Sequence, residues 1–165
     1  MGTLRCVSDD LDYIAALLRD AQAIVILTGA GISTESGIPD FRGPQGLWTR
    51  DPKAEKMATL QHYVADPDVR RLAWQSRLES PAWTAEPNAG HRALVHLERR
   101  GKLHTLITQN VDGLHQKAGS DPGRVVEIHG TMREVTYIVL RSAPPNVQFD
   151  DSPVGTVPMN VPADE

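Results

Sequence analysis

The chain of 165 residues has little cysteine, no surplus of basic residues and no long apolar run. Cys6 is its only cysteine, so neither an internal disulfide nor a zinc cage of several thiolates can form. Acidic residues outnumber basic ones by 21 to 17, which offers no basic surface for nucleic acid or an acidic membrane. No apolar run approaches the roughly 20 residues that a membrane span needs. We therefore expect an intracellular, cytoplasmic protein, with the nucleus as the alternative, and no direct contact with nucleic acid or membrane.

Enough apolar residues are present for a packed core, since they make up 40% of a chain the size of one ordinary domain. Three runs read as strands: 23–28 (AIVILT), 103–108 (LHTLIT) and 124–130 (RVVEIHG). The first is apolar throughout, which is typical of a parallel strand covered on both faces. Because helical segments separate the runs, the sequence predicts an α/β fold with a doubly wound parallel sheet of the Rossmann type.

Two segments carry the start and stop signals of helices. Residues 8–21 begin with Ser8 as a cap. Their apolar residues recur on one face, which we expect to be buried: Leu11, Ile14, Leu18 and Ala21. A later helix follows Asn88 as its cap and stops at Gly101.

Between these helices, residues 53–85 read as several short helices, which predicts a helical insertion in the sheet domain. We expect its apolar anchors to be Leu72, Trp74, Leu78 and Trp83.

A glycine turn follows the first strand, where Thr28 leads into Gly29-Ala30-Gly31. Glycine lets backbone N–H groups approach a diphosphate closely, and a helix beginning at Ile32 or Ser33 would point its positive end at the phosphates. A dinucleotide fingerprint would require a third glycine at position 34, where Thr34 stands instead. Taken alone, the turn is as consistent with a purely structural role as with a ligand site.

The continuation of this loop places an acid, an aromatic ring and a guanidinium side by side. Asp40, Phe41 and Arg42 follow Pro39, which stiffens the chain. Together they can hold an amide-bearing ring, cover it and bind phosphate. The alternative is a surface turn with one salt bridge and one buried phenylalanine.

Polar side chains also follow the second strand directly. Gln109, Asn110 and Asp112 stand at the carboxyl end of a predicted parallel strand, where open α/β sheets bind their ligands. Asn and Asp two residues apart can donate to and accept from a carboxamide or sugar hydroxyls. The alternative is that Asn110 or Asp112 only caps the next helix.

One histidine stands apart from the other five. His129 ends the third predicted strand beside Gly130, at the same sheet edge as the two polar segments. Histidine is the natural proton acceptor at cellular pH, so His129 is the candidate general base. We interpret the others as structural: His62, His91, His96, His104 and His115. Their spacing does not indicate a metal site.

Three segments in this order, "GAGISTESGIPDFRGPQGLW", "TQNVDGLH" and "EIHGT", resemble the sirtuin family of NAD-dependent protein deacylases over about residues 10 to 135. The resemblance implies that His129 is the general base. It implies contacts with NAD for the following residues: Gly29, Ala30, Gly31, Ile32, Ser33, Pro39, Asp40, Phe41, Arg42, Trp48, Gln109, Asn110, Val111 and Asp112. The resemblance also implies that no third glycine is needed at Thr34, because the family uses a glycine turn of its own.

The reaction that the resemblance implies transfers an acyl group from a lysine of a protein substrate to the ADP-ribose part of NAD. Its products are free lysine, nicotinamide and O-acyl-ADP-ribose. Sirtuins that favour succinyl or malonyl groups share a Tyr-x-x-Arg pair, and the comparable positions here are Trp74 and Arg77. Because Trp74 cannot supply the phenol, acidic acyl groups are not expected.

The chain departs from the family after the third strand. The resemblance implies a structural zinc held by two Cys-x-x-Cys pairs, yet no cysteine follows His129, so the zinc module is absent. The second half of the nucleotide-binding sheet has no counterpart either. We expect residues 1–135 to form a partial sirtuin catalytic domain and 136–165 a divergent, disordered tail, in which TYIVL could make one more strand. Truncation, alternative splicing or a frameshift would explain this pattern.

Two classes of function remain open from the sequence. As an enzyme, the chain would be an NAD-dependent lysine deacylase, with mono-ADP-ribosyl transfer as a chemically adjacent variant. As a non-enzyme, it would be an inactive fragment that retains part of the NAD pocket.

Overall fold

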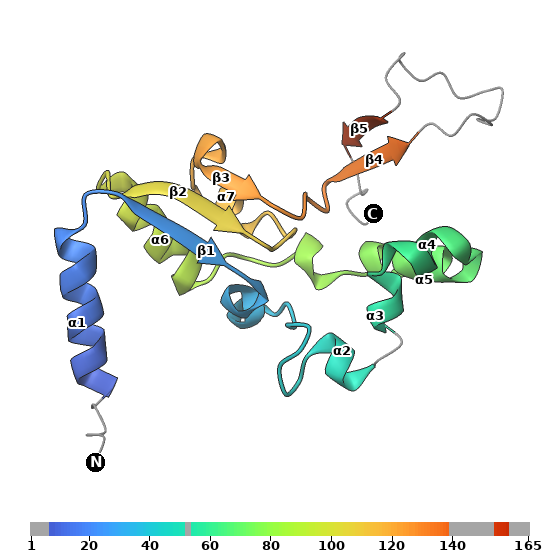
Figure 1. The fold of residues 1–165 in the computed structure, drawn as a ribbon, viewed down its shortest axis with the longest axis horizontal. Helices are drawn as coiled ribbons and strands as arrows, with labels where there is room; N and C mark the ends of the chain where they lie inside the picture. Colours follow the sequence, from blue (N-terminus) through green and yellow to red (C-terminus); the bar gives the residue numbers. More distant parts are fainter. Residues whose placement is uncertain (1–6, 52–53, 139–153, 159–165) are drawn as a thin grey trace.

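A parallel sheet of three strands lies at the centre of the protein, for which the computed structural model describes residues 7–51, 54–138 and 154–158 (Figure 1). Its strand order is β1-β2-β3. The strands are β1 (Ile24–Thr28), β2 (Leu103–Thr108) and β3 (Val125–Glu127). Both strand pairs are parallel, so the predicted α/β class with an open parallel sheet is confirmed.

One face of the sheet is covered by helices and forms the core. The crossover helices α6 (Ala89–Arg99) and α7 (Leu114–Ala118) contact each other, and α6 packs on β2. Leu103, Leu106 and Leu114 are fully buried in this layer. The predicted caps of α6 are present, because the Asn88 side chain accepts from two backbone amides at its start and Gly101 adopts a left-handed φ of 70° after its end.

The other face of the sheet is exposed among the described residues. Val25 and Leu27 of β1 are 60% and 63% exposed, and Val126 and Ile128 are also exposed. The prediction that the first strand is covered on both faces is therefore wrong here. Its apolar pattern reflects two apolar faces, but no described helix lies over the second one.

The first helix, α1 (Val7–Asp20), has the predicted bounds to within one residue and stands away from the sheet (Figure 1). Of the four residues expected on a buried face, Leu11 and Ile14 are exposed and Leu18 and Ala21 are half-buried, so the expectation is wrong for the first half of the helix. The helix is tied at its carboxyl end, where Lys102 Nζ donates to the carbonyls of Arg19 and Ala21.

The predicted helical insertion consists of short helices, which lie at the side of the sheet that the strand arrows point to (Figure 1). Their bounds are α2 (Leu47–Arg50), α3 (Ala54–Met57), α4 (Leu60–Ala65), α5 (Pro67–Leu78) and the 3₁₀ turn η2 (Pro81–Trp83). Trp74 and Trp83 are half-buried, as expected of anchors. Leu72 and Leu78 are each 54% exposed, so the expectation that they are buried anchors is wrong.

Beyond the sheet, the 3₁₀ turn η3 (Pro122–Arg124) leads into β3, and β4 (Glu134–Ile138) pairs antiparallel with β5 (Val154–Pro158). Residues 136–138 and 154–158 of the predicted disordered tail are thus in strands. The rest of that tail, with the last two residues of TYIVL, lies outside the described residues. In the described part of the chain, no helix has the length and apolar character to cross a membrane.

Candidate functional site

The predicted site segments meet at one edge of the sheet because the three strands end in register. Thr28 of β1 pairs with Thr108 of β2, which pairs with Glu127 of β3. The residues that follow these strand ends are Gly29, Gln109 and Ile128, all at the carboxyl edge (Figure 1). This is the edge at which open α/β sheets bind ligands.

The glycine turn continues as a 3₁₀ segment, η1 (Ala30–Ser36), and not as the α-helix expected from Ile32 or Ser33. Its tighter winding begins at Ala30, and it stops at Gly37, which has a left-handed φ of 84°. The helix whose positive end was expected to face the phosphates is therefore a short 3₁₀ segment of seven residues. The backbone at Gly31 is open to a ligand, because a Cβ built there would meet nothing within 4 Å.

Buried hydrogen bonds join this turn to the segment after β2. Ser33, only 1% exposed, donates from Oγ to Asp112 Oδ2 at 2.7 Å. Asn110 Nδ2 donates to the Gly29 carbonyl and to Ser33 Oγ, both at 3.1 Å. Asp112 Oδ1 also accepts from the Leu114 amide at 2.9 Å at the start of α7, but the cap residue of that helix is Gly113, so the alternative that Asp112 only caps it is wrong.

Asn88 is a residue of this cluster that the sequence analysis identified only as a helix cap. Its Nδ2 donates to the Ile32 carbonyl at 2.7 Å and to Ser36 Oγ at 3.0 Å, while its Oδ1 caps α6. The cap signal was visible in the sequence, but the contact with η1 spans 56 residues and has no local signature.

The segment from Pro39 to Trp48 forms a cluster of its own. The rings of Phe41 and Trp48 have centroids 4.9 Å apart, and the Arg42 guanidinium lies 4.5 Å over the Trp48 ring. Asp40 Oδ1 accepts from the Gly43 amide at 3.2 Å. Arg42 also approaches Glu55 at 3.8 Å, so the surface salt bridge of the alternative interpretation is present. Phe41 is exposed, not buried as that alternative requires.

His129 lies in a turn just past β3, not within the strand as predicted. The strand ends early because the Gly130 amide donates to the Glu127 carbonyl and Gly130 adopts a left-handed φ of 75°. His129 is exposed. Val111 connects this region to the second motif, since its carbonyl accepts from the Met132 amide at 2.9 Å.

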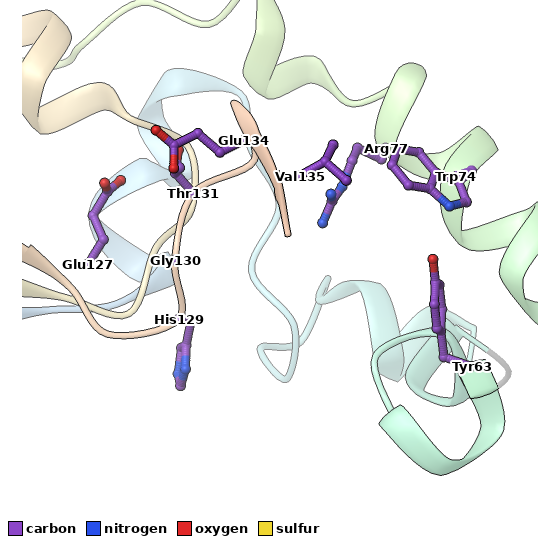
Figure 2. Close-up of a pocket in the computed structure, with 9 residues that line it drawn as sticks. All are labelled: Tyr63, Trp74, Arg77, Glu127, His129, Gly130, Thr131, Glu134 and Val135. Atoms are coloured by element: carbon purple, nitrogen blue, oxygen red, sulfur yellow. The ribbon is translucent and has the colours of Figure 1, made fainter. Parts of the chain in front are cut away.

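An open hollow of about 480 Å³ adjoins His129 (Figure 2). Trp74 and Arg77 of α5 and Tyr63 of α4 line it on the opposite side from His129, and the Tyr63 hydroxyl points toward Trp74. Tyr63 is a lining residue that the sequence analysis missed, because the α4–α5 packing that places it is not encoded in its neighbours along the chain.

Two carboxylates, Glu127 and Glu134, also line this hollow. Burial raises the pKa of Glu127, and the Gln116 side chain opposes that shift by hydrogen bonding. The hollow therefore combines one histidine, one guanidinium and two acids with aromatic walls.

A metal site is not among these features. In the described ranges, no three His, Cys, Asp or Glu side chains are grouped to hold a metal ion. Cys6 lies outside them and is a single thiol. These residues do not fit the four-cysteine zinc that the resemblance implied.

The region that contains these motifs is similar to known proteins. The Sir2 family profile matches residues 29–143. NAD-dependent protein deacetylase 2 of Streptomyces coelicolor is 58% identical over 111 residues, which are 67% of this chain and 46% of that protein. This chain thus spans about half the length of the curated relatives that it matches.

Solved structures share the fold as well. A Sir2 homologue in complex with NAD superposes with a TM-score of 0.65 and 36% identity, covering 89% of this chain and 59% of that one. A Sir2 protein with a deacetylated p53 peptide and 3′-O-acetyl ADP-ribose gives a TM-score of 0.66 and 38% identity, covering 78% and 50%.

Proposed function

This chain belongs to the Sir2 family, and we propose that it binds NAD and acts as an NAD-dependent protein lysine deacetylase. The observation that carries the proposal is the meeting of the glycine turn, the Gln109–Asp112 segment and His129 at one sheet edge. NAD, when bound, supplies the ADP-ribose group to which the acyl group is transferred. A Sir2 homologue of the same fold is known in complex with NAD, which supports this cofactor.

The diphosphate of NAD would lie against the glycine turn. Gly29 and Gly31 present bare backbone there, and the space beside Gly31 is open. Ser33, Asn110 and Asp112 hold the turn in one geometry before any ligand arrives, which lowers the ordering cost of binding. Arg42 is held by an exposed ion pair with Glu55 and by its contact with the Trp48 ring, and exchanging the ion pair for a phosphate would cost little, with Phe41 and Trp48 as apolar cover.

The nicotinamide and its ribose would be held by the segment after β2. Asn110 uses its amide nitrogen within the turn, which leaves Oδ1 as an acceptor for a hydroxyl or a carboxamide N–H. Gln109 is exposed, and its amide group lies close to Gly29. Asp112 contributes through Ser33, and its oxygens retain a second lone pair each for a carboxamide.

His129 would take the proton from a ribose hydroxyl. Its place on an exposed turn, beside a hollow large enough for a second substrate, allows the imidazole to reach a bound sugar. The Tyr63 and Trp74 rings across the hollow offer apolar surface to the stem of an acyl-lysine.

The charge around the hollow favours a neutral acyl group. Glu127 and Glu134 oppose an anionic succinyl or malonyl group more than the single Arg77 attracts it. Acetyl-lysine is therefore the proposed substrate, in line with the deacetylase name of the Streptomyces relative.

Nicotinamide release from NAD with an acetyl-lysine peptide tests the proposal. We expect turnover by the full chain and a loss of at least about 100-fold in His129→Ala. His104→Ala is the matched control, because His104 is an exposed histidine on β2 away from the carboxyl edge. A folded chain that binds no NAD, or equal rates in both variants, would contradict the proposal.

A further inference from the structure

Two buried imidazoles lie behind the glycine turn and take no part in the chemistry proposed above. His91 of α6 is 0% exposed and His115 of α7 is 1% exposed. Their ring centroids are 4.9 Å apart with the planes at 54°. Burial lowers the pKa of both rings, that of His115 to about 4, so both are neutral at physiological pH.

His115 contacts the residue from which the turn departs. Its Nε2 lies 2.9 Å from Thr28 Oγ1, and Thr28 is the last residue of β1, directly before Gly29. The contact joins residues 87 positions apart and is buried. It therefore joins the end of β1, where the turn begins, to α7.

His91 contacts the residue that holds the middle of the turn. Its Nδ1 accepts from the Asn88 backbone amide at 3.4 Å, and its own amide donates to Asn88 Oδ1. Asn88 is thereby fixed with its Nδ2 on the Ile32 carbonyl and Ser36 Oγ. The imidazole acts on the turn through this asparagine.

We propose that the His91–His115 pair is a positioning device for the Gly29–Ser36 turn, with one ring fixing its start and the other fixing Asn88 at its middle. The two rings pack against each other, so a displacement of either ring would shift both Thr28 and Asn88. Both rings are buried and neither lines the hollow at His129, so both are positioning residues. The inference rests on the proposed function only where it concerns NAD affinity.

Hydrogen exchange of the full chain tests the positioning without any nucleotide. The readout is the set of amides that close the turn, which belong to Ile32, Gly37 and Ile38, measured against the Ile24 amide at the far end of β1. We expect His115→Leu to accelerate exchange of these three amides by about 5- to 10-fold relative to Ile24, the effect of losing one hydrogen bond. His115→Gln, which places an amide nitrogen near the Nε2 position, should restore most of the protection.

Two further variants separate positioning from packing. Thr28→Val removes the same hydrogen bond while keeping both rings, and it should match His115→Leu without adding to it in the double variant. Val95→Ala removes buried volume from α6, one helical turn beyond His91, and it should leave the ratio of turn to Ile24 exchange unchanged. If His115→Leu does not fold, the exchange of the turn amides in Thr28→Val tests the proposal in its place. Equal ratios in Thr28→Val and Val95→Ala would overturn the proposal.

Calorimetry with NAD then links the turn to binding. We expect His115→Leu and His91→Leu to weaken NAD binding by about 5- to 10-fold, with nicotinamide release at saturating NAD little changed. His91→Asn, whose Oδ1 can replace Nδ1 as acceptor, should recover affinity. If the parent chain binds no NAD but the exchange pattern holds, the proposed function fails and the positioning stands. If NAD affinity and exchange are both unaffected in the leucine variants, the positioning fails.

Discussion

The two halves of the candidate site are built differently. The half around the glycine turn, which we call the closed half, consists of buried and half-buried polar side chains that hydrogen-bond to one another and to the turn: Ser33, Asn88, Asn110 and Asp112. The half around His129, which we call the open half, is a hollow lined by side chains from four separate elements. Under the proposed function, NAD would meet a hydrogen-bonded site of fixed geometry, and a protein substrate of variable sequence would meet an open one.

This difference predicts that substitutions in the closed half change stability and NAD binding together. Substitutions in the open half should change turnover alone. The free energy of unfolding, measured in urea, can be compared between variants of the two halves.

The largest effect is expected at Asp112 in the closed half. Asp112→Ala leaves the buried Ser33 hydroxyl and the Leu114 amide without their acceptor, and hydrogen bonds to a charged group are the stronger kind. We expect a loss of about 3 kcal/mol in the free energy of unfolding. Asp112→Asn keeps one acceptor oxygen and should lose about half as much. Equal losses in both variants would show that charge, and not hydrogen bonding, is what matters.

The next effect is expected from acid. Folded His115 has a pKa of about 4 against an unfolded value near 6.5, with burial as the main cause. His91 disfavours its charged form, and Asp112 favours it. Between these two values the unfolded chain binds more protons than the folded one, so stability is present above pH 6.5 and declines as the pH falls toward 4.

The decline should reach about 3 kcal/mol for this single group by pH 4. His91 should contribute further, because burial lowers its pKa, Asp112 opposes that shift and Arg92 adds to it. His115→Gln should flatten the profile in this window. A variant profile parallel to that of the parent would assign the acid sensitivity to other groups.

A smaller effect is expected at Asn88, where two roles can be separated. Asn88→Asp keeps the oxygen that caps α6 but turns an acceptor toward the Ile32 carbonyl, while Asn88→Ala loses both contacts. We expect losses of about 1 kcal/mol for Asp and somewhat more for Ala. NAD affinity, measured by calorimetry, should fall similarly in both. An aspartate variant with unchanged NAD affinity would remove Asn88 from the cofactor site.

The smallest effect on stability is expected at His129 in the open half. Because the side chain is exposed, His129→Ala should change the free energy of unfolding by less than about 0.5 kcal/mol even though turnover is lost. A strongly destabilised variant would show that His129 belongs to the packed structure, and the contrast between the two halves would disappear.

The sequence predicts the parts of this arrangement that depend on local patterns. The run Leu103–Thr108 is a strand with the predicted bounds, and α6 begins after Asn88 and stops before Gly101 as its capping residues indicate. The carboxyl-edge rule then places Gly29 and Gln109 side by side, as the strand register shows.

What the sequence does not predict depends on contacts between distant segments. His91 and His115 look like ordinary histidines in isolation, because their meeting requires α6 and α7 to pack on one face of the sheet. Tyr63 enters the hollow only through the packing of α4 on α5. The exposed side chains of Leu11 and Leu27 differ from expectation for a related reason. An apolar pattern shows which face of a helix or strand is suited to burial, but it does not identify the element that packs against that face.

The uncovered sheet face determines how this protein behaves when it is warmed or concentrated. Within the described residues, Val25, Leu27, Val126 and Ile128 form an exposed apolar strip, and β1 and β3 are the edge strands of the sheet. Since the attraction between such strips strengthens on warming near room temperature, cold and dilute solutions favour the single chain. Light scattering should rise with both temperature and concentration, and a lysine in place of Leu27 should delay that rise.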